Sequence, residues 1–233
     1  GSQLLLHQIP LSGPIDSQIV AVSFDGDRVR VLGKGIRPSW SADGNSFVCE
    51  RRSREAGIWM IDAGGRSGRR ISAGRSPRWS PDGTEIAFLN DNGVLIYELE
   101  TDKVRPVLLR EDHPYQDLGN DIAWSPDGNQ LAILGNFAAT SQLLIVSSRG
   151  PQSGEVRVRY SFDTALRGDL HWANRGSILL GVRDPKSGKI GLMMIQPDGE
   201  NTPDPVEALS EISGVRSACT TPDGRWYVAV VEE

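Results

Sequence analysis

Short apolar runs, separated by turn residues, recur along the whole chain. Residues 58–62, 94–99, 143–146 and 191–195 are rich in Ile, Leu, Val and Met, and Gly, Pro, Asn and Asp stand between such runs. Runs of this length with turn chemistry at both ends predict strands and not helices. No apolar run approaches the ~18 residues of a membrane-spanning helix. The pattern predicts an all-β protein.

One phrase precedes many of these runs. Residues 77–83 read PRWSPDG, residues 38–44 read PSWSADG and residues 122–128 read IAWSPDG. Weaker copies are LHWANRG at 170–176 and ACTTPDG at 218–224. The Trp position falls at 40, 79, 124, 172 and 220, in steps of 39, 45, 48 and 48 residues. A period of this size with a turn at a fixed place predicts a propeller or a solenoid.

The phrase itself predicts a hairpin corner. Ser80 suits the first position of a type I turn, Pro81 presets the second, and Gly83 takes the left-handed fourth position. Such a turn with a left-handed Gly is a common hairpin connection. The recurring Asp43, Asp82, Asp127 and Asp223 are therefore expected to cap turns and not to act as acids, since an active site does not need one acid per repeat.

Each repeat predicts four short strands, with the Trp phrase between the first two. The chain begins with a hairpin of residues 18–24 and 28–32, and its last copy ends after two strands, at 225–231. These ends complement each other, so we expect N- and C-terminal strands to share one blade, which removes free sheet edges. The prediction is one β-propeller domain over residues 1–233, five-bladed. The extra apolar run at 3–10 leaves six blades open, and Gly1 and Ser2 suggest a cloning remnant.

Composition narrows the function classes. The net charge of −5 does not favour binding to nucleic acid or to an anionic membrane. Two cysteines, Cys49 and Cys219, are too few for a disulfide framework and have no metal-binding spacing. Each lies in a predicted strand, where a buried free thiol is favoured over a disulfide between them.

The Trp-Ser-Pro-Asp-Gly corner, the apolar strand after it and the Leu-Tyr-x-Leu-type strand before a polar turn resemble the WD40-like repeats of TolB-type β-propellers. The likeness covers nearly the whole chain, with departures at residues 173–176 and at the fifth copy, which lacks the Trp. It implies a docking platform for peptides or protein domains, often periplasmic or secreted in bacteria. Similar repeats also form accessory domains of larger proteins, including the prolyl oligopeptidase group.

Catalysis has few candidate residues. The Gly-x-Ser-x-Gly nucleophile pattern is absent, as is a phosphate-binding Gly-rich loop. His7, His113 and His171 stand far apart in sequence, and for His171 a role inside the sheet is favoured over ligand binding. A small propeller enzyme or sugar-binding domain would use Asp91, Asp121 and Asp169, provided that two carboxyl groups lie roughly 5–10 Å apart. We predict no enzyme activity, cofactor or metal.

A protein or peptide partner is the favoured function, because charge is unevenly distributed. Residues 28–78 hold 12 Lys and Arg against 4 Asp and Glu, and the rest of the chain is acidic. Loops on a rigid scaffold carry binding residues, and Arg grips carboxylates with paired hydrogen bonds. We expect an acidic partner segment to meet one group of arginines, at the loop face near the central channel: Arg51, Arg52, Arg54, Arg75 and Arg78. An ordinary solvated surface is the alternative reading of these arginines.

A second candidate region is the long connection at 110–121, since a long loop in a tight repeat is often functional. Basic or aromatic partner groups are expected there and nearby, at Asp112, His113, Tyr115, Asp121, Phe137, Asp169 and His171. We expect a monomer, located in the periplasm or elsewhere outside the cytoplasm by resemblance. The alternatives are the propeller enzyme and a sensor or accessory domain of a longer protein.

Overall fold

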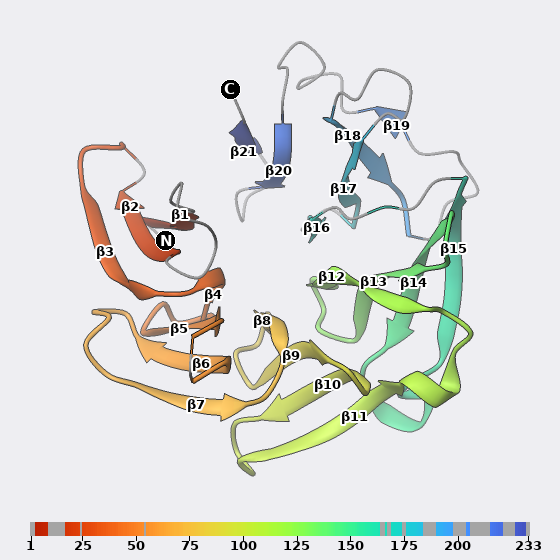
Figure 1. Ribbon diagram of the computed structural model, residues 1–233, viewed down its shortest axis with the longest axis horizontal. Coiled ribbons are helices and arrows are strands. Elements are labelled where there is room, and N and C mark those ends of the chain that lie inside the picture. Colours follow the sequence, from red (N-terminus) through yellow and green to blue (C-terminus); the bar gives the residue numbers. More distant parts are fainter. Residues whose placement is uncertain are drawn as a thin grey trace. The chain divides into compact units, whose positions relative to one another are not determined.

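The computed structural model describes residues 3–8, 17–23, 25–53, 55–163, 166, 169–173, 176–183, 190–197, 204–205, 215–220 and 227–231. Strands make up almost all of its regular structure (Figure 1). The described helices are two short 3-10 turns, η2 (Arg110–Asp112) and η3 (Gly150–Gln152). Within this part of the chain there is no helix of the length and apolarity that crossing a bilayer requires.

The strands fall into two compact units, residues 1–106 and 107–233. The first unit holds three antiparallel sheets, in which consecutive strands are neighbours. They are β1 (Gln3–Gln8), β2 (Gln18–Ser23) and β3 (Val29–Lys34); then β4 (Ile36–Trp40), β5 (Ser46–Arg51), β6 (Gly57–Asp62) and β7 (Gly68–Ser72); then β8 (Arg75–Trp79), β9 (Glu85–Asn90), β10 (Gly93–Glu98) and β11 (Lys103–Leu109), whose last residues belong to the second unit.

The second unit repeats the pattern. Its strands are β12 (Asp117–Trp124), β13 (Gln130–Asn136), β14 (Ser141–Ser147) and β15 (Val156–Phe162); then β16 (Leu170–Trp172), β17 (Ile178–Arg183), β18 (Ile190–Ile195) and β19 (Asp204–Pro205); then the pair β20 (Val215–Thr220) and β21 (Tyr227–Val231). The predicted fold class is confirmed: the chain is an all-β, five-bladed β-propeller, with five antiparallel sheets of three or four strands and the additional pair β20–β21. The sharing of one blade by the terminal strands stays a prediction.

Two details refine the sequence-based expectations. Residues 3–8 form a strand that pairs with β2, in register from Gln3 opposite Ser23 to Gln8 opposite Gln18. The connection expected over 110–121 is shorter, because β12 already begins at Asp117. Its first residues pair with β13, and a bulge between Leu118 and Ile122 then shifts the register. The apolar residues at 118 and 122 allow this early start, since both are buried.

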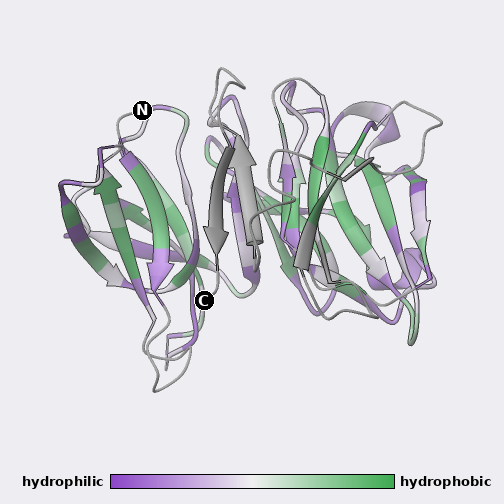
Figure 2. Cartoon of the chain, turned by 90° about the horizontal axis from the view of Figure 1, so that it is seen from above, coloured by the Kyte–Doolittle hydropathy of each residue, from purple (hydrophilic) through white to green (hydrophobic). Residues whose placement is uncertain are grey.

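Hydrophobic residues follow the strands and polar ones the turns (Figure 2). In the first unit, one apolar cluster includes Ile19, Phe47 and Ile61, and another includes Ile58, Trp79 and Phe88. Cys49 belongs to the first cluster and is a free, buried thiol, as predicted; burial raises its pKa to about 12. The side chain of Cys219 lies outside the described residues. Burial of these faces supplies the main driving force for folding.

The repeated corner has the same hydrogen bonds in three blades. The hydroxyls of Ser41, Ser80 and Ser125 each donate to the Asp two residues later at 2.6 Å. The same hydroxyls accept the N–H five residues later at 2.9–3.0 Å. The Gly at the fourth position has φ between 71° and 74° in all three turns. The Asp residues therefore cap turns, as the sequence predicts.

Arginines of the outer strands reach the next blade. Arg30 on β3 donates to the carbonyl of Ala63 at 2.9 Å, and Arg69 on β7 pairs with Asp102 at 3.2 Å. In the second unit, Arg159 on β15 donates to the carbonyl of Gln196 at 2.6 Å. In each case the partner lies in or beside the turn that leads to the outer strand of the following sheet. Part of the arginine-rich surface is therefore structural.

Replacing Ser80 by Ala should destabilise the protein. The hydroxyl is buried, and its loss leaves the Glu85 N–H without its acceptor. We expect a loss of about 1–2 kcal/mol in the free energy of unfolding, measured by urea denaturation. The control Asp91→Ala, in an exposed turn, should change stability by less than about 0.5 kcal/mol. Equal effects of the two variants would contradict the assigned role of Ser80.

The same turns predict a loss of stability in acid. The Ser hydroxyls, followed by backbone N–H groups, lower the pKa of Asp43 and Asp127. A carboxyl whose folded-state pKa is lowered contributes stability above its unfolded pKa of about 3.9, and that contribution disappears as pH falls through the folded-state pKa. The variant D43N/D127N should therefore lose less stability than the wild type between pH 5 and pH 2, as measured by thermal melts. If the stability of the variant and of the wild type fell equally with pH, these turns would not contribute to the loss of stability in acid.

Candidate functional site

The bulge on the innermost strand is the backbone feature that shapes the site. Arg37, Ser76 and Asp121 each stand three residues before a blade Trp, and a register shift spans each of them. Arg37 and Ser76 have φ of 51° and 55° and both precede a proline. This left-handed conformation is rare outside glycine, and proline further restricts the residue before it. The surrounding contacts must therefore hold both residues in place.

Glu50 is the main contact at these two bulges. Its side chain is 6% exposed, and it accepts hydrogen bonds from Arg37 Nη1 at 3.1 Å and Arg52 Nε at 2.6 Å. Its Oε2 also accepts the N–H of Ser76 at 3.2 Å. The equivalent positions on β9 and β13, Leu89 and Leu134, are apolar. This blade therefore carries a buried carboxylate where the two following blades carry leucine.

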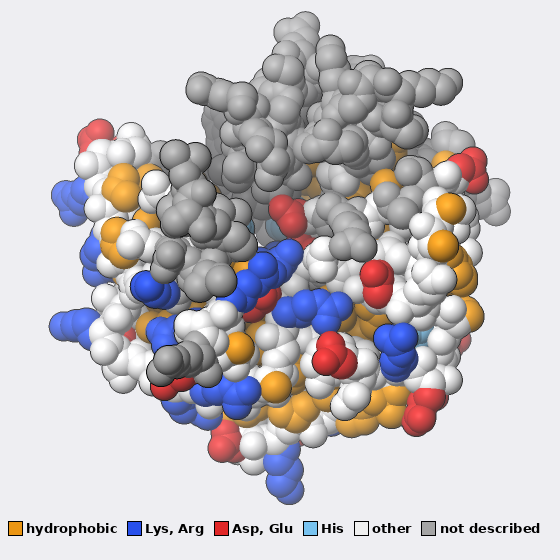
Figure 3. Space-filling view, viewed as in Figure 1, with side chains coloured by type: hydrophobic (Ala, Val, Ile, Leu, Met, Phe, Trp, Pro, Cys, Tyr) orange, Lys and Arg blue, Asp and Glu red, His pale blue; other side chains and the backbone are white. Residues whose placement is uncertain are grey.

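His7 and Arg78 complete what we call the arginine cluster: His7, Arg37, Glu50, Arg52, Ser76 and Arg78. Part of His7 remains accessible to solvent, yet burial against its neighbours lowers the pKa of the ring, and the charges of Arg37 and Arg78 lower it further. Three arginines against one glutamate give the cluster a net charge of about +2. Figure 3 shows cationic side chains gathered over β4 and β8, with an acidic one beside them.

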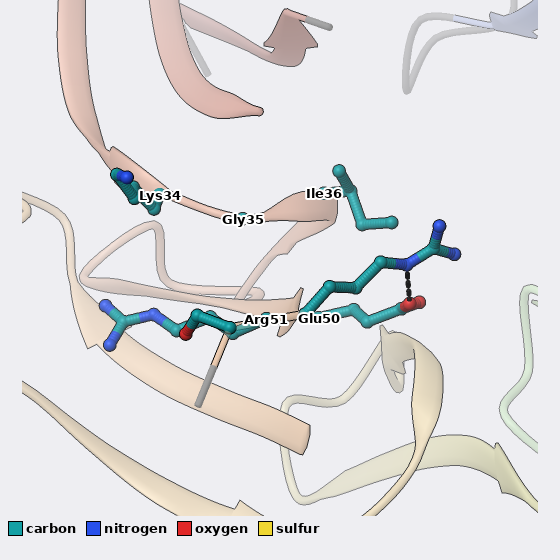
Figure 4. Close-up of a pocket in the computed structure, with 7 residues that line it drawn as sticks. Lys34, Gly35, Ile36, Glu50 and Arg51 are labelled. Atoms are coloured by element: carbon teal, nitrogen blue, oxygen red, sulfur yellow. Dashed lines mark hydrogen bonds and ion pairs between the residues drawn. The ribbon is translucent and has the colours of Figure 1, made fainter. Parts of the chain in front are cut away.

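Only part of the predicted arginine group lies in this cluster. Arg52 and Arg78 belong to it. Arg51 points away from Glu50 (Figure 4), because successive side chains of β5 alternate between faces, and its guanidinium lies 4.0 Å from the ring centroid of Trp59. Arg75 is half-buried at the first position of β8. Arg54 lies outside the described residues.

A small pocket opens beside Glu50 (Figure 4). It is lined by Lys34, Gly35, Ile36, Glu50, Arg51, Arg52 and Ser53. Arg52 is more open to solvent than Arg37, since 40% of its side chain is exposed against 19% for Arg37. The pocket therefore gives direct access to a guanidinium that Glu50 already orients.

The second predicted group forms a stack of rings in the other unit. His113 lies 5.5 Å from Tyr115 and Tyr115 lies 5.1 Å from Phe137, measured between ring centroids. Tyr115 is 7% exposed and its hydroxyl donates to Gln142 at 2.8 Å. A Cβ on Gly135 would lie 2.7 Å from the Tyr115 ring, so the glycine makes room for it. Tyr115 therefore anchors the connection, while Phe137 stays half-buried.

The remaining predicted residues occupy different environments. Asp121 is buried, and its two oxygens accept the N–H groups of Ile122 and Leu170, each at 3.0 Å. This carboxylate joins β12 to β16 and brings Asp121 next to Asp169, which is exposed. Asp112 is exposed in η2, and His171 is half-buried on β16. Among the described residues, no three His, Cys, Asp or Glu side chains form a metal-binding group.

The sequence analysis missed Arg37, Glu50 and Ser76 as members of one site. The sequence did contain a signal for Arg37 and Ser76. Both stand three residues before a blade Trp, as Asp121 and Asp169 do. Glu50 could have been found as the charged residue at a position that is leucine in the two following blades.

The fold is that of a β-propeller, and comparison with known proteins shows which solved propellers it is similar to. No protein-family model matches the sequence, and no curated protein matches it either. The chain is similar in structure to TolB from Acinetobacter baumannii, with 16% identity and a TM-score of 0.75 over 100% of this chain and 58% of that one. The β-propeller domain of the Trilobed protease from Pyrococcus furiosus matches with 16% identity and a TM-score of 0.59, over 100% and 75% of the two chains.

A third similar structure is the acylaminoacyl peptidase of Pyrococcus horikoshii, with 14% identity and a TM-score of 0.57 over 92% of this chain and 38% of that one. The chain thus has a TolB-like propeller fold and spans 58% of the length of that TolB chain. At these identities the likeness concerns the fold, and function must be argued from the site.

Replacing Glu50 by Ala should destabilise the first unit strongly. Arg37 and the Ser76 N–H would lose a buried partner, and breaking a buried ion pair costs about 3–5 kcal/mol. Since Arg52 is partly exposed, we expect a loss of about 2–3 kcal/mol in urea denaturation. Glu55→Ala, at an exposed position after the same strand, is the control and should have little effect. A small loss for Glu50→Ala would mean that the arginines hold the bulges without it.

Proposed function

We propose that this chain is a non-catalytic interaction domain that binds an acidic segment of a protein partner at the arginine cluster. The observation that carries the proposal is the hydrogen bonding of Arg37 and Arg52. Within the described residues, each guanidinium donates to Glu50 through one nitrogen and keeps its other N–H groups for a ligand. Arg has five such donors, in a planar arrangement that fits a carboxylate.

The geometry favours a ligand that carries carboxylates. Glu50 holds both guanidiniums in place before a ligand arrives, so less side-chain entropy is lost on binding. The net positive charge of the cluster attracts acidic groups, in a chain that is otherwise acidic. The TolB-like structure supports a role as a scaffold. The same resemblance supports a location outside the cytoplasm, and we include that location in the proposal.

A catalytic function has weaker support. Some propellers of similar structure belong to peptidases, but two of the three candidate carboxylates of this chain, Asp121 and Asp91, are poorly placed to act as an acid or a base. Both oxygens of Asp121 are bound to backbone N–H groups, and Asp91 lies in an exposed turn. A general acid or base must reach its substrate by hydrogen bonding. We therefore place partner binding ahead of the propeller enzyme and of the sugar-binding domain.

Charge reversal tests the proposal. A synthetic ten-residue peptide rich in glutamate is titrated into the protein in a calorimeter. We expect R52E/R78E to weaken binding by more than ~10-fold, because two attractive charges become repulsive. Arg66→Glu, at an exposed turn of the same unit, should change the affinity less than about twofold at 150 mM salt, where distant charges are screened.

Two results would contradict the proposal. Equal losses in R52E/R78E and Arg66→Glu would mean that only overall charge matters. Unchanged binding in R52E/R78E would place the acidic ligand elsewhere on the protein. Circular dichroism of each variant confirms that the comparison is made between folded proteins.

A further inference from the structure

In the part of the chain that the structure describes, the outer edge of the first sheet has no strand beside it. Among the described strands, β3 pairs only with β2, in the order β1-β2-β3. Figure 1 shows β3 on the outer side of this sheet. The edge strand of a sheet offers unpaired backbone N–H and C=O groups to an incoming chain.

The register shows which backbone groups of β3 face outward. The N–H of Ser23 donates to the carbonyl of Arg28 at 2.9 Å, and the pairs continue as Val22 opposite Val29, Ala21 opposite Arg30 and Val20 opposite Val31. In an antiparallel ladder, hydrogen-bonded and non-hydrogen-bonded pairs alternate. Arg28 and Arg30 therefore bond to β2, and the N–H and C=O groups of Val29 and Val31 point away from the sheet.

The side chains on this edge form two different faces. Val29 and Val31 are 66% and 56% exposed, the highest values among the large hydrophobic residues that the structure describes. They share one face, because side chains alternate along a strand. Arg28 and Arg30 lie on the opposite face, and both are exposed even though Arg30 also bonds to Ala63. One face of the edge is thus apolar and the other is cationic.

Two other outer strands, β11 and β15, are less suited to pair with an added strand. β11 contains Pro106, which has no N–H to donate. On β15 both Arg157 and Arg159 bond to carbonyls of the next blade, and its exposed valine, Val158, stands alone at 48%. Of the outer strands β3, β11 and β15, β3 is therefore the one that best accepts a partner.

A second copy of this chain fits the edge poorly. Pairing Val29 with Val31 of an antiparallel copy sets Arg30 opposite Arg30, and pairing Val29 with Val29 sets Arg28 opposite Arg30. Pairing Val31 with Val31 sets Arg28 opposite Lys34. Like charges directly opposite each other destabilise a strand pair. The occupant should carry the reverse charge at these alternate positions.

We infer that β3 is a strand-addition site for an extended acidic segment of another protein, in which acidic residues alternate with β-branched ones. The acidic residues lie beside Arg28 and Arg30, and the β-branched residues cover Val29 and Val31. Main-chain hydrogen bonds to Val29 and Val31 provide affinity, and the alternating side chains provide specificity. This site is separate from the arginine cluster.

A peptide titration tests the inference. An eight-residue peptide that alternates glutamate and valine is added to ¹⁵N-labelled protein, and amide shifts and hydrogen exchange are followed by NMR. We expect slower exchange at the amides of Val29 and Val31. Val31→Lys should weaken binding ~10-fold or more, because it places a charge on the apolar face. The matched control Val104→Lys, on β11 at a valine that is 41% exposed, should bind as the wild type does.

Several results would overturn the inference. They are the absence of binding at millimolar peptide, protection that excludes Val29 and Val31, equal binding by Val31→Lys, and equal binding of a peptide with lysine in place of glutamate. Concentration-dependent dimerisation that competes with the peptide would instead identify a second copy as the occupant. R52E/R78E should bind this peptide at β3 like the wild type, which separates this site from the arginine cluster.

Discussion

The fold depends on hydrogen bonds by which a side chain of one blade holds the backbone of the next. Ser39 Oγ accepts the N–H of Trp79 at 3.2 Å, Glu50 accepts that of Ser76, and Asp121 accepts that of Leu170. The acceptors differ in chemistry, yet all act on the first strand of the following sheet. A blade cannot bury both of its faces alone, so this contact fixes how neighbouring apolar faces meet. The arginines of the outer strands add a second connection at the other end of the blade.

The repeat made much of this fold predictable. Turn chemistry is local, and Ser80, Asp82 and Gly83 specify their hydrogen bonds within six residues of sequence. The periodicity of the apolar residues then predicts the strands, and the spacing of the Trp positions predicts how the strands group into blades. The early start of β12 was not predictable, because it depends on pairing with β13 across a bulge at polar residues, and a bulge has no clear signature in a single sequence.

The candidate site was predictable only in part, for a geometric reason. Five arginines close in sequence suggested one surface, but Arg51, the last residue of β5, lies against Trp59, while Arg52, just after the strand, pairs with Glu50. Other arginines of the same stretch, Arg30 and Arg69, bind to neighbouring turns. Counting charge along a sequence does not distinguish these roles. The burial of Glu50 does, because it shows which guanidiniums are held by an internal acceptor.

The position three residues before each Trp has a consequence for how such proteins diversify. It is Arg37 in one blade, Ser76 in the next, then Asp121 and Asp169, each in or directly before the first strand of its sheet. The same position in the fold thus carries an arginine, a serine or an aspartate, depending on the blade. A substitution at this one position can therefore change the chemical group of a single blade while the turn and the other strands of that blade are kept.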